Sequence, residues 1–402
     1  MDNALEGLRV VDFSRFAAGP LGTKLLADYG ADVIKIESVN YPDLPRVSSP
    51  YKDGIPGLNR SARFIHFNTS KRSMALDLNH PRASDVVRRL IAVSDVVVEN
   101  FAPNVLKKFN LGYESVREIK PDIIMVSCSI LGRSQDAAFR GYGTHGLALS
   151  GHYELTGWPE GEPACPATSF YADHVVPFIV VFATLSALEH KRNTGKGQYI
   201  DISQLEPMAI LISPAILDYT LTGTQASRMG NRHPDAAPHS AYRCQGEDKW
   251  CTIAVFNEEQ WRRLVKALGN PSWSQQEKFS SLALRKENEA ELDSLIEAWT
   301  SQHTAEDIMR CLLDAQVPSG VVQNAQELFD DPQLKHREYL TALRHPEIGI
   351  CAHSRPPMIL SETPAQVHTS PCLGQDTADI CLELLKMDPA EFTELMAEGV
   401  FN

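Results

Sequence analysis

The chain has 402 residues, of which 43% are hydrophobic and 22% charged, a composition typical of a globular protein with more than one domain. Its formal net charge is −13 at pH 7, so the chain as a whole repels the phosphates of nucleic acids, and we expect no nucleic-acid partner. The longest apolar run, VVPFIVVFATLSAL, is shorter than the roughly 20 residues that span a bilayer, which predicts a buried helix and no membrane anchor.

The eight cysteines are scattered without CxxC pairs, which indicates reduced thiols. The amino terminus, MDNALEGLRVVDF, lacks a basic region followed by an apolar core, so we expect no signal peptide and a cytoplasmic location. The 13 histidines form neither H-E-x-x-H nor a Cys/His cluster at ligand spacing, so we expect no metal site.

Short β-branched runs alternate with helical periodicity through the first half of the chain. The runs are RVVDF, DVIKIE, DVVVEN and DIIMVSCS, and helical segments begin between them near Pro20, Pro81 and Pro103. Alternation of this kind predicts a parallel sheet covered on both faces, and therefore a doubly wound α/β domain.

The turn after the first run, SRFAAGPLGTK, raises the question of dinucleotide binding. It contains Gly19 and Gly22 but not the G-x-G-x-x-G pattern, and Glu37 only loosely mimics the acid that binds ribose in such proteins. The turn indicates instead a loop of small residues whose backbone N–H groups meet a ligand, including an anionic one, where a helix begins.

Polar clusters follow the strands or lie in loops. Their members include Lys71 and Arg72 in FNTSKRSMALDL, and Asn100, Phe101, Lys107 and Lys108 in VVVENFAPNVLKKFNLG. Ligands of open α/β sheets bind at the carboxyl ends of strands, so a spatial cluster of these residues would be a phosphate site. Each basic residue alone is more typical of a solvated surface.

The stretch at 170–206, FYADHVVPFIVVFATLSALEHKRNTGKGQYIDISQLE, joins an acid to a long apolar helix. Asp173 immediately precedes that helix, which we expect to run to about Arg192 before a turn and the strand QYIDIS. Unpaired N–H groups at the amino end of a helix favour an ionised carboxylate. Position alone is more typical of a capping acid than of a nucleophile.

The second half of the chain changes character at MGNRHPDAAPHS, a linker at 221–241 that closes the first part of the large domain, residues 1–220. AYRCQGEDKWCTIAVF then predicts a hairpin turning at Gly246–Asp248, followed by helices at about 258–268, 287–300 and 304–315. We therefore expect a small α+β domain at 242–316, inserted in the large domain to which residues 317–402 return.

In their order, these motifs resemble the family III CoA-transferases (CaiB/BaiF), which include formyl-CoA:oxalate and carnitine CoA-transferases. Nearly the whole chain takes part, through LRVVDFSRFAAGPLGTKLLADYGADVIKIE, FNTSKRSMALDL, DVVVENFAP, RNTGKGQYIDIS and VPSGVV. The resemblance implies a large Rossmann-like domain with an inserted small domain. It also implies an interlocked dimer in which each chain threads the other, the partner being identical or a paralogue.

In that family the acid before the helix is the catalytic nucleophile, and the matching residue is Asp173. The carboxylate attacks a donor acyl-CoA thioester to give an aspartyl–acyl anhydride and CoA thiolate. The thiolate then attacks the anhydride, which leaves an aspartyl-CoA thioester, and an acceptor acid repeats the sequence in reverse. Coenzyme A is thus a cosubstrate, and no tightly bound cofactor is expected.

The family's CoA contacts carry over position by position. Phe16, Ala17 and Ala18 match the loop that lines the nucleotide, Leu76 a residue that touches the adenine region, Asn100 and Phe101 a pair near the pantetheine arm, and Lys108 a basic residue that meets the phosphates.

This chain departs from the family at several positions. Ser38 and Asn79 stand where relatives are often basic, so Lys71 or Arg72 is expected to serve the phosphates instead. The loop HPDAAPHS, near Pro238, lacks the glycines of the mobile loop in formyl-CoA transferase. Val176 stands three residues after the acid, where the family usually has a glycine.

Two alternatives remain within the resemblance. The α-methylacyl-CoA racemases share the fold and the CoA site but move a proton at the α-carbon with a histidine and an acid. The racemase histidine would fall at Tyr142, which favours transfer, although His145 is a candidate for a displaced base. The second alternative is a non-catalytic subunit that binds CoA.

The aromatic side chains before Asp173 bear on the substrate. Tyr153, Trp158 and Phe170 indicate an apolar or aromatic acid, and GHYELTGWP resembles subunits of succinyl-CoA:benzylsuccinate CoA-transferase. The resemblance therefore implies succinyl-CoA as donor and an acid such as benzylsuccinate as acceptor.

Overall fold

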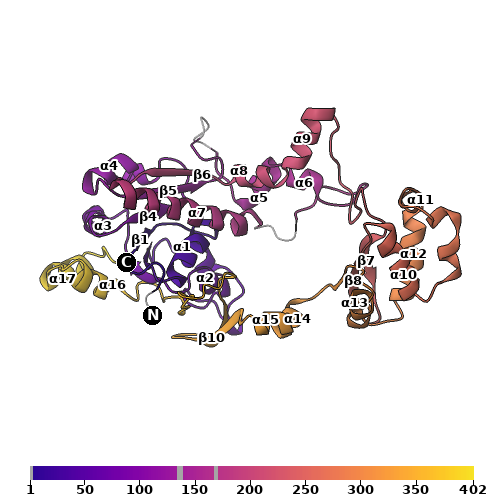
Figure 1. Ribbon diagram of the computed structural model, residues 1–402. Helices are drawn as coiled ribbons and strands as arrows, with labels where there is room; N and C mark the ends of the chain where they lie inside the picture. The colour runs from indigo at the N-terminus through magenta and orange to yellow at the C-terminus, as the bar shows by residue number, and fades with distance from the viewer. Residues whose placement is uncertain (1–2, 134–138, 167–170) are drawn as a thin grey trace. The chain divides into compact units, whose positions relative to one another are not determined.

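The computed structural model describes residues 3–133, 139–166 and 171–402 and contains two compact units (Figure 1). The larger unit comprises Met1–His152, Cys165–Thr224 and Pro332–Asn402. The smaller unit comprises Tyr153–Ala164 and Gln225–Asp331. Each unit has its own hydrophobic core.

A six-stranded sheet with all strands parallel forms the centre of the larger unit. Its strands are β1 (Arg9–Asp12), β2 (Asp32–Glu37), β3 (Arg72–Ala75), β4 (Val96–Glu99), β5 (Ile124–Ser129) and β6 (Tyr199–Ser203). They lie in the order β3-β2-β1-β4-β5-β6, which is the order of Rossmann-type sheets. The predicted doubly wound α/β fold is therefore confirmed, and the strand order reverses between β1 and β4.

Strand β3 was not among the strands expected from the sequence. It pairs with β2 in parallel, from Ile34 opposite Arg72 to Glu37 opposite Ala75. Only four residues belong to it, and it opens with an arginine, so its apolar run is too short to stand out.

Helices cover both faces of the sheet. On one face, α1 (Ala18–Asp28) packs along the long helix α7 (Tyr171–Thr194). A Cβ atom at Gly22 of α1 would lie 2.9 Å from Cγ1 of Val180, so glycine permits this close approach.

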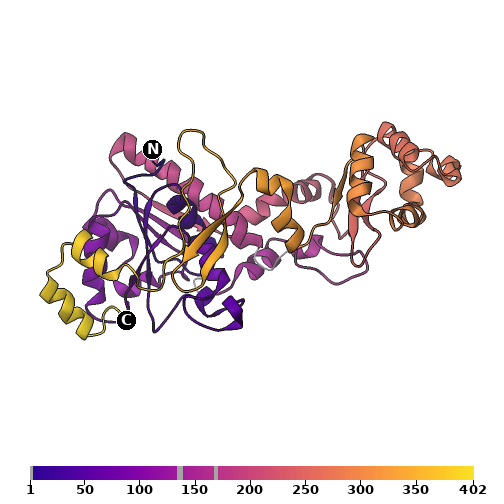
Figure 2. The same ribbon diagram turned by 90° about the horizontal axis from the view of Figure 1, so that it is seen from below.

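The other face of the sheet carries the main apolar core, which includes Val11, Val97 and Met125. Covering it are α3 (Ala83–Ala92), α4 (Tyr113–Ile119), α16 (Thr377–Asp379), the π-helical turn Ile380–Leu384 and α17 (Pro389–Ala397). Ion pairs tie α17 to α3, with 2.7 Å between Arg89 and Glu391. In Figure 2 the yellow carboxyl-terminal helices lie beside the purple helices of this face.

The remaining segments of the larger unit surround the sheet. They are α2 (Ala62–Phe67), α5 (Gly143–Leu149), α8 (Leu205–Leu211), α9 (Ser213–Thr222), α15 (Pro332–His336), β10 (Leu340–His345), β11 (Gly349–Ser354) and the 3-10 turns Leu44–Val47, Lys52–Gly54 and Leu106–Phe109. Helix α6 (His152–Leu155) crosses the boundary between the units.

Where a helix was expected near Pro103, the chain forms only the 3-10 turn Leu106–Phe109. Asn110 ends that turn in the left-handed conformation with φ of 54°, a geometry that terminates helices.

Among the described residues, one helix is long and apolar enough to cross a membrane, judged by length and composition only, and this helix is α7. It instead packs against α1, β5 and β6. The expectation of a buried helix is nevertheless wrong for one part of its surface. Phe178, Ile179, Phe182 and Leu185 are exposed, and Phe182 retains 71% of its accessible surface.

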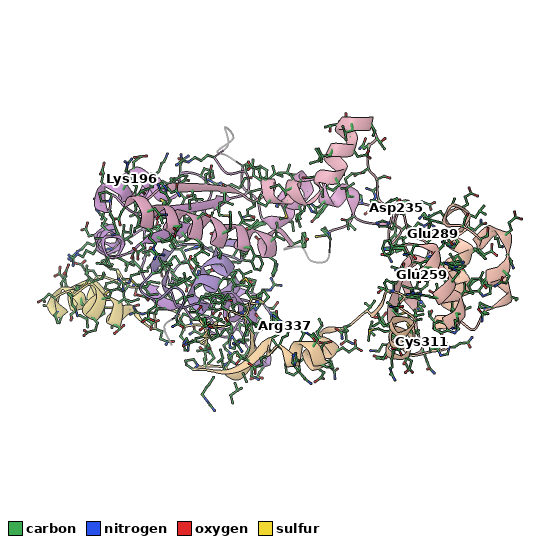
Figure 3. All side chains as sticks on the ribbon, in the orientation of Figure 1. Lys196, Asp235, Glu259, Glu289, Cys311 and Arg337 are labelled. Carbon is green, nitrogen blue, oxygen red and sulfur yellow. The ribbon has the colours of Figure 1, made fainter. Side chains whose placement is uncertain are left out.

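The smaller unit pairs a three-stranded antiparallel sheet with helices. Its strands are β7 (His239–Arg243), β8 (Trp250–Ala254) and β9 (Ser319–Val321), and its helices are α10 (Glu258–Ala267), α11 (Leu282–Glu287), α12 (Glu289–Thr300), α13 (Ala305–Asp314) and α14 (Ala325–Asp330). Figure 3 labels Glu259 on α10, Glu289 on α12 and Cys311 on α13. The hairpin and the helices α10, α12 and α13 match the predicted elements.

The boundaries of the smaller unit differ from the expected 242–316. Strand β9 pairs with β8 after residue 316, so the unit runs on to Asp331. It also includes Tyr153–Ala164. Trp158 of that segment packs directly on the backbone of the predicted linker, because a Cβ atom at Gly230 would lie 2.3 Å from its ring.

Candidate active site

Asp173 lies in the first turn of α7, and only 8% of its surface is exposed. Burial raises the pKa of its carboxyl to about 6, and the nearby His174 opposes this increase. The sequence suggested a pKa lowered by the helix end, but desolvation outweighs that effect here. A carboxyl with this pKa is still mostly ionised at pH 7.

The carboxylate of Asp173 lies against the backbone of Gly143, the first residue of α5. A Cβ atom at that position would be 2.6 Å from Oδ2 of Asp173 and 3.0 Å from its Cγ, so only glycine fits without a shift. The entry to α5 is fixed by Tyr142, whose N–H donates to Nδ1 of His145 at 3.1 Å. Sequence reasoning missed Gly143, although the three closely spaced glycines of GYGTHG were an available signal.

The loop after β1 reaches the same region. Phe16 adopts φ of 64°, a conformation that non-glycine residues rarely take, and its N–H donates to Oδ1 of Asp43 at 2.9 Å. The Phe16 ring lies 5.2 Å from that of Tyr142, edge to face. Tyr142 precedes the glycine that touches Asp173, so these contacts bring the β1 loop close to the acid. Ala17 and Ala18, which follow, are buried.

Asn100 fixes the β1 loop from the end of β4. Its Oδ1 accepts from the N–H of Arg15 at 2.7 Å, and its Nδ2 donates to the carbonyl of Arg15 at 2.7 Å. The guanidinium of Arg15 lies 5.8 Å above the ring of Phe101. These contacts join the carboxyl ends of β1 and β4, the switch point at which open α/β sheets bind ligands.

Lys71 is buried beneath this loop. Its Nζ donates to Oδ2 of Asp12 at 2.8 Å, to the carbonyl of Pro20 at 2.9 Å and to Oδ1 of Asn68 at 2.9 Å. Burial lowers the pKa of Lys71 to about 8, while Asp12 acts in the opposite direction. All three ammonium protons of Lys71 donate to groups of the protein itself, so Lys71 supports the β1 loop. This buried ammonium has no proton left to donate to a phosphate.

Two further expected contacts lie away from the switch point. Arg72 opens β3, at the amino edge of the sheet, where it pairs with Asp32 at 3.4 Å and with Asp379. That edge is opposite the one on which Asn100 lies. Leu76 is 1% exposed and belongs to the apolar core.

The positions beside the ends of β2 and β3 hold their own partners. Glu37 forms a buried ion pair with Arg46 at 2.7 Å, so it is not available as a ribose-binding acid. Ser38 is 4% exposed, and Asn79 donates from its backbone to Asp77. Lys108 is exposed on the turn that follows Phe101, together with Lys107.

Phe101 also lines an open pocket at the carboxyl ends of β4, β5 and β6. Glu99, Ser127 and Asp201 lie next to one another across these strands and line the pocket. Burial raises the pKa of Glu99 to about 7, opposed by a hydrogen bond from Ser127. The basic Lys107 and Arg133 also line the pocket.

The aromatic residues expected around the substrate fall in different places. Phe170 lies outside the described residues, and Tyr153 and Trp158 belong to the smaller unit. In the described part of the chain, no group of three or more His, Cys, Asp or Glu side chains could hold a metal ion.

A Rossmann-type sheet with a loop held at its switch point places the chain in the class of doubly wound α/β proteins, which bind their ligands at that point. Residues 5–377 match CoA-transferase family III. The chain therefore belongs to that family and is a CoA-transferase.

Known proteins are similar to this chain over nearly its full length. The chain is 33% identical to succinate–glutarate CoA-transferase of Agrobacterium fabrum, covering 94% of this chain and 95% of that protein. It is 31% identical to succinyl-CoA–D-citramalate CoA-transferase of Chloroflexus aurantiacus, covering 98% of each. The crystal structure of a CaiB/BaiF family protein from Brucella suis is similar, with a TM-score of 0.87 and 33% identity over 96% of this chain and all of that one.

Proposed function

We propose that the enzyme transfers CoA from succinyl-CoA to a free dicarboxylic acid, with Asp173 as the covalent nucleophile. The observation that carries this proposal is the carboxylate of Asp173, which is buried, has a pKa of about 6 and faces the bare backbone of Gly143. It is ionised at neutral pH and poorly solvated, as a reactive carboxylate should be.

The reaction proceeds through two kinds of acyl intermediate. An oxygen of Asp173 attacks the thioester carbon of succinyl-CoA, the C–S bond breaks, and CoA leaves as a thiolate while an aspartyl–succinyl anhydride forms. The thiolate then attacks the aspartyl carbonyl carbon, which releases succinate and leaves an aspartyl-CoA thioester. An acceptor carboxylate attacks that thioester, and the returning thiolate attacks the acceptor carbonyl of the new anhydride, which regenerates Asp173.

Burial of the acid also protects the intermediates. Anhydrides and thioesters hydrolyse if water reaches them, and a site that excludes water limits this loss. Because Gly143 has no side chain, there is room beside the carboxylate of Asp173, which becomes bulkier when it carries CoA.

For CoA we propose the switch point as the binding region. The loop Phe16–Ala18, held by Asn100, and the ring of Phe101 would line the pantetheine and nucleotide, and the exposed Lys108 would meet phosphate. Arg15, which the sequence did not single out, is a further cation at this edge. Arg72 is not part of this region, because it pairs with Asp32 and Asp379 at the start of β3.

The relatives support a dicarboxylate as the acceptor. Those reported above are named for succinate with glutarate and for succinyl-CoA with D-citramalate, and succinate, glutarate and citramalate are all dicarboxylates. Benzylsuccinate, the acceptor suggested by the sequence, is a dicarboxylate with an aromatic substituent and remains a specific candidate within this class.

We further propose that the enzyme is a dimer, with an identical or a paralogous partner, and that its location is cytoplasmic. The exposed apolar face of α7, with Phe178, Ile179, Phe182 and Leu185, supports the dimer, because surfaces of this kind mark interfaces. All eight cysteines are free, as is usual in a reducing compartment.

The test is incubation with succinyl-CoA and a panel of acids that contains glutarate, mesaconate, citramalate and benzylsuccinate. Mass analysis should find a new acyl-CoA and a CoA adduct on the peptide that contains Asp173. The variant Asp173→Ala should form neither product while binding CoA within a few fold of the wild type. Retained turnover in that variant would contradict the assignment. Solvent deuterium at the α-carbon of a 2-methylacyl-CoA would point to racemisation instead.

A further inference from the structure

The loop after β1 uses its backbone N–H groups inside the protein. Three successive N–H groups of this loop each donate to a side-chain oxygen, over distances between 2.7 and 2.9 Å. The pairs of donor and acceptor are Ser14 with Asp12, Arg15 with Asn100, and Phe16 with Asp43. The sequence suggested that the backbone N–H groups of this turn meet a ligand, and these three are not free to do so.

Phe16 depends on such a contact more than its neighbours do. Its φ of 64° lies in the left-handed region, which costs free energy for a residue with a side chain and persists where the surrounding structure fixes it. The bond from the Phe16 N–H to Oδ1 of Asp43, of 2.9 Å, is a contact of this kind. In this conformation the Phe16 ring lies edge to face with that of Tyr142.

The carboxylate of Asp43 is directed at the β1 loop by both of its oxygens. Asp43 directly precedes the 3-10 turn Leu44–Val47, where an aspartate commonly caps the turn, but its side chain turns to the loop instead. Its Oδ2 lies 3.0 Å from Nζ of Lys35, which donates to the carbonyl of Ser14 at 2.8 Å. One oxygen therefore acts on the loop directly and the other acts through Lys35.

Stability alone does not account for this buried pair. Asp43 is 1% exposed and Lys35 is fully buried, and a pair of this kind is often no more stabilising than apolar side chains of the same volume. The same segment contacts the loop once more, since the guanidinium of Arg15 donates to the carbonyl of Tyr41 at 2.9 Å. Residues 41–43 thus support one side of the loop, while Asn100 supports it from β4.

We propose that Asp43 is a positioning residue of the acyl-CoA site, which holds Phe16 in its left-handed conformation and gives the β1 loop its binding shape before CoA arrives. The proposal rests on the function proposed above, since it takes this loop as part of the CoA site. A loop that is already ordered loses little conformational entropy when a ligand binds. Because Asp43 is buried, it acts through Phe16, and its removal should raise the KM for acyl-CoA and not lower kcat.

The experiment combines calorimetry with CoA and steady-state kinetics with succinyl-CoA and the best acceptor of the acid panel. We expect Asp43→Ala to raise the Kd for CoA and the KM for succinyl-CoA about tenfold, the range for a lost hydrogen bond to a charged group, and to change kcat by less than about threefold. Asp43→Asn keeps an oxygen for the Phe16 N–H but loses the charge opposite Lys35. It should therefore bind CoA within about threefold of the wild type while it unfolds at a lower temperature.

Asp28→Ala is the matched control. Asp28 is as deeply buried as Asp43 and is paired with Lys24 at 2.6 Å, but it is the last residue of α1, at the end of that helix away from the loop. This variant should lose stability and bind CoA as the wild type does. An equal loss of affinity in Asp28→Ala, or a normal Kd in Asp43→Ala, would overturn the proposal.

Hydrogen exchange of the wild type tests the loop even if Asp43→Ala does not fold. The amides of residues 14–16 should exchange slowly in the enzyme without CoA and gain little protection when CoA is added. Fast exchange that slows only with CoA would show that the ligand shapes the loop, and would sink the proposal. If the wild type binds no CoA, the proposed CoA region fails, and exchange of the loop in Asp43→Ala against Asp28→Ala still decides whether Asp43 positions it.

Discussion

The side-chain amide of Asn100 makes two hydrogen bonds to the backbone of Arg15, one to its N–H and one to its carbonyl, each of 2.7 Å. A residue at the end of one strand thus fixes the loop that leaves another strand 85 positions earlier. Arg15 directly precedes Phe16, whose ring lies 5.2 Å from that of Tyr142. Asn100 therefore sets the shape of the proposed CoA site without having to touch CoA.

Replacement of Asn100 should consequently weaken acyl-CoA binding through the loop. We expect Asn100→Leu, which has a similar volume and cannot make either bond, to raise the KM for acyl-CoA about tenfold and to lower stability by about 1–3 kcal/mol. Asn193→Ala, at an exposed position near the end of α7, should change neither quantity. Kinetics and thermal unfolding of both variants would check this, and a normal KM for Asn100→Leu would contradict it.

The ionisation of Asp173 should set the acid limb of the pH–rate profile. Its pKa is raised to about 6 by burial, and only the carboxylate is nucleophilic. The rate of adduct formation should therefore fall about tenfold per pH unit below that value and level off above it. Single-turnover measurements between pH 5 and 8 would reveal a midpoint near 6, whereas a rate that stays flat down to pH 5, as the ordinary aspartate pKa of 3.8 would give, would mean that the acid is better solvated than the structure shows.

The same burial should make Asp173 costly for stability. A carboxyl whose folded pKa of about 6 exceeds its unfolded 3.8 contributes stability below 3.8 that is lost as the pH rises through 6. At pH 8 the wild type carries the full cost of the buried charge, whereas Asp173→Asn does not. We expect this variant to have a higher Tm at pH 8, by up to about 2–3 kcal/mol in the free energy of unfolding, and a smaller gain at pH 5.

The comparison of wild type and Asp173→Asn needs a buffer series in which the oligomeric state stays constant. A gain that is the same at both pH values would show that the effect comes from packing and not from the charge.

Helix α5 offers a matched pair of glycines. Gly143→Ala would place a methyl group 2.6 Å from Oδ2 of Asp173, so the carboxylate must move. A Cβ atom at Gly146, on the same helix, would meet nothing closer than 3.9 Å. We expect Gly143→Ala to lower kcat by about 100-fold, as displacements of about 1 Å at a reacting group do, and Gly146→Ala to remain close to wild type. Equal activity in the two variants would argue against a reacting group at Asp173.

The exposed face of α7 should be covered in the assembled enzyme. Phe182→Asp places a charge on its most exposed phenylalanine and should shift the protein from dimer to monomer or aggregate in light scattering. His190→Asp introduces the same charge at the polar end of the helix and should leave the assembly intact. A dimer that tolerates the charge at Phe182 would place the interface elsewhere.

The sequence predicted the parallel sheet because strands such as β4 and β5 contain uninterrupted apolar runs, VVV and IMV, and burial on both faces of a sheet leaves this pattern. It did not predict β3, whose four residues begin with a charge. The site shows the same limit. Asp173 has a recognisable place before a helix, whereas the role of Lys71 depends on Asp12, Pro20 and Asn68, three groups that only the folded chain brings to its ammonium.

Some expected contacts were displaced for a similar reason. Lys71 and Arg72 are neighbours in sequence, yet one is buried below the β1 loop and the other pairs with acids at the amino edge. Successive side chains of an extended chain point to opposite faces, so these two neighbours meet different surroundings at the start of β3. The sequence did not indicate Gly143, because its role is to leave space for Asp173, and that neighbour is known only from the folded chain.

The carboxyl-terminal segment has a consequence for the order in which the protein can be made. The backbone of Ser73 and Ala75 on β3 donates to side chains of Asp376 and Thr377, about 300 residues later in the chain. On the ribosome, the outer strand of the sheet is synthesised early but must wait for its last partners until translation is almost complete. Loss of the final 30 residues, by a premature stop or by proteolysis, would therefore expose the oldest part of the chain and not merely shorten its end.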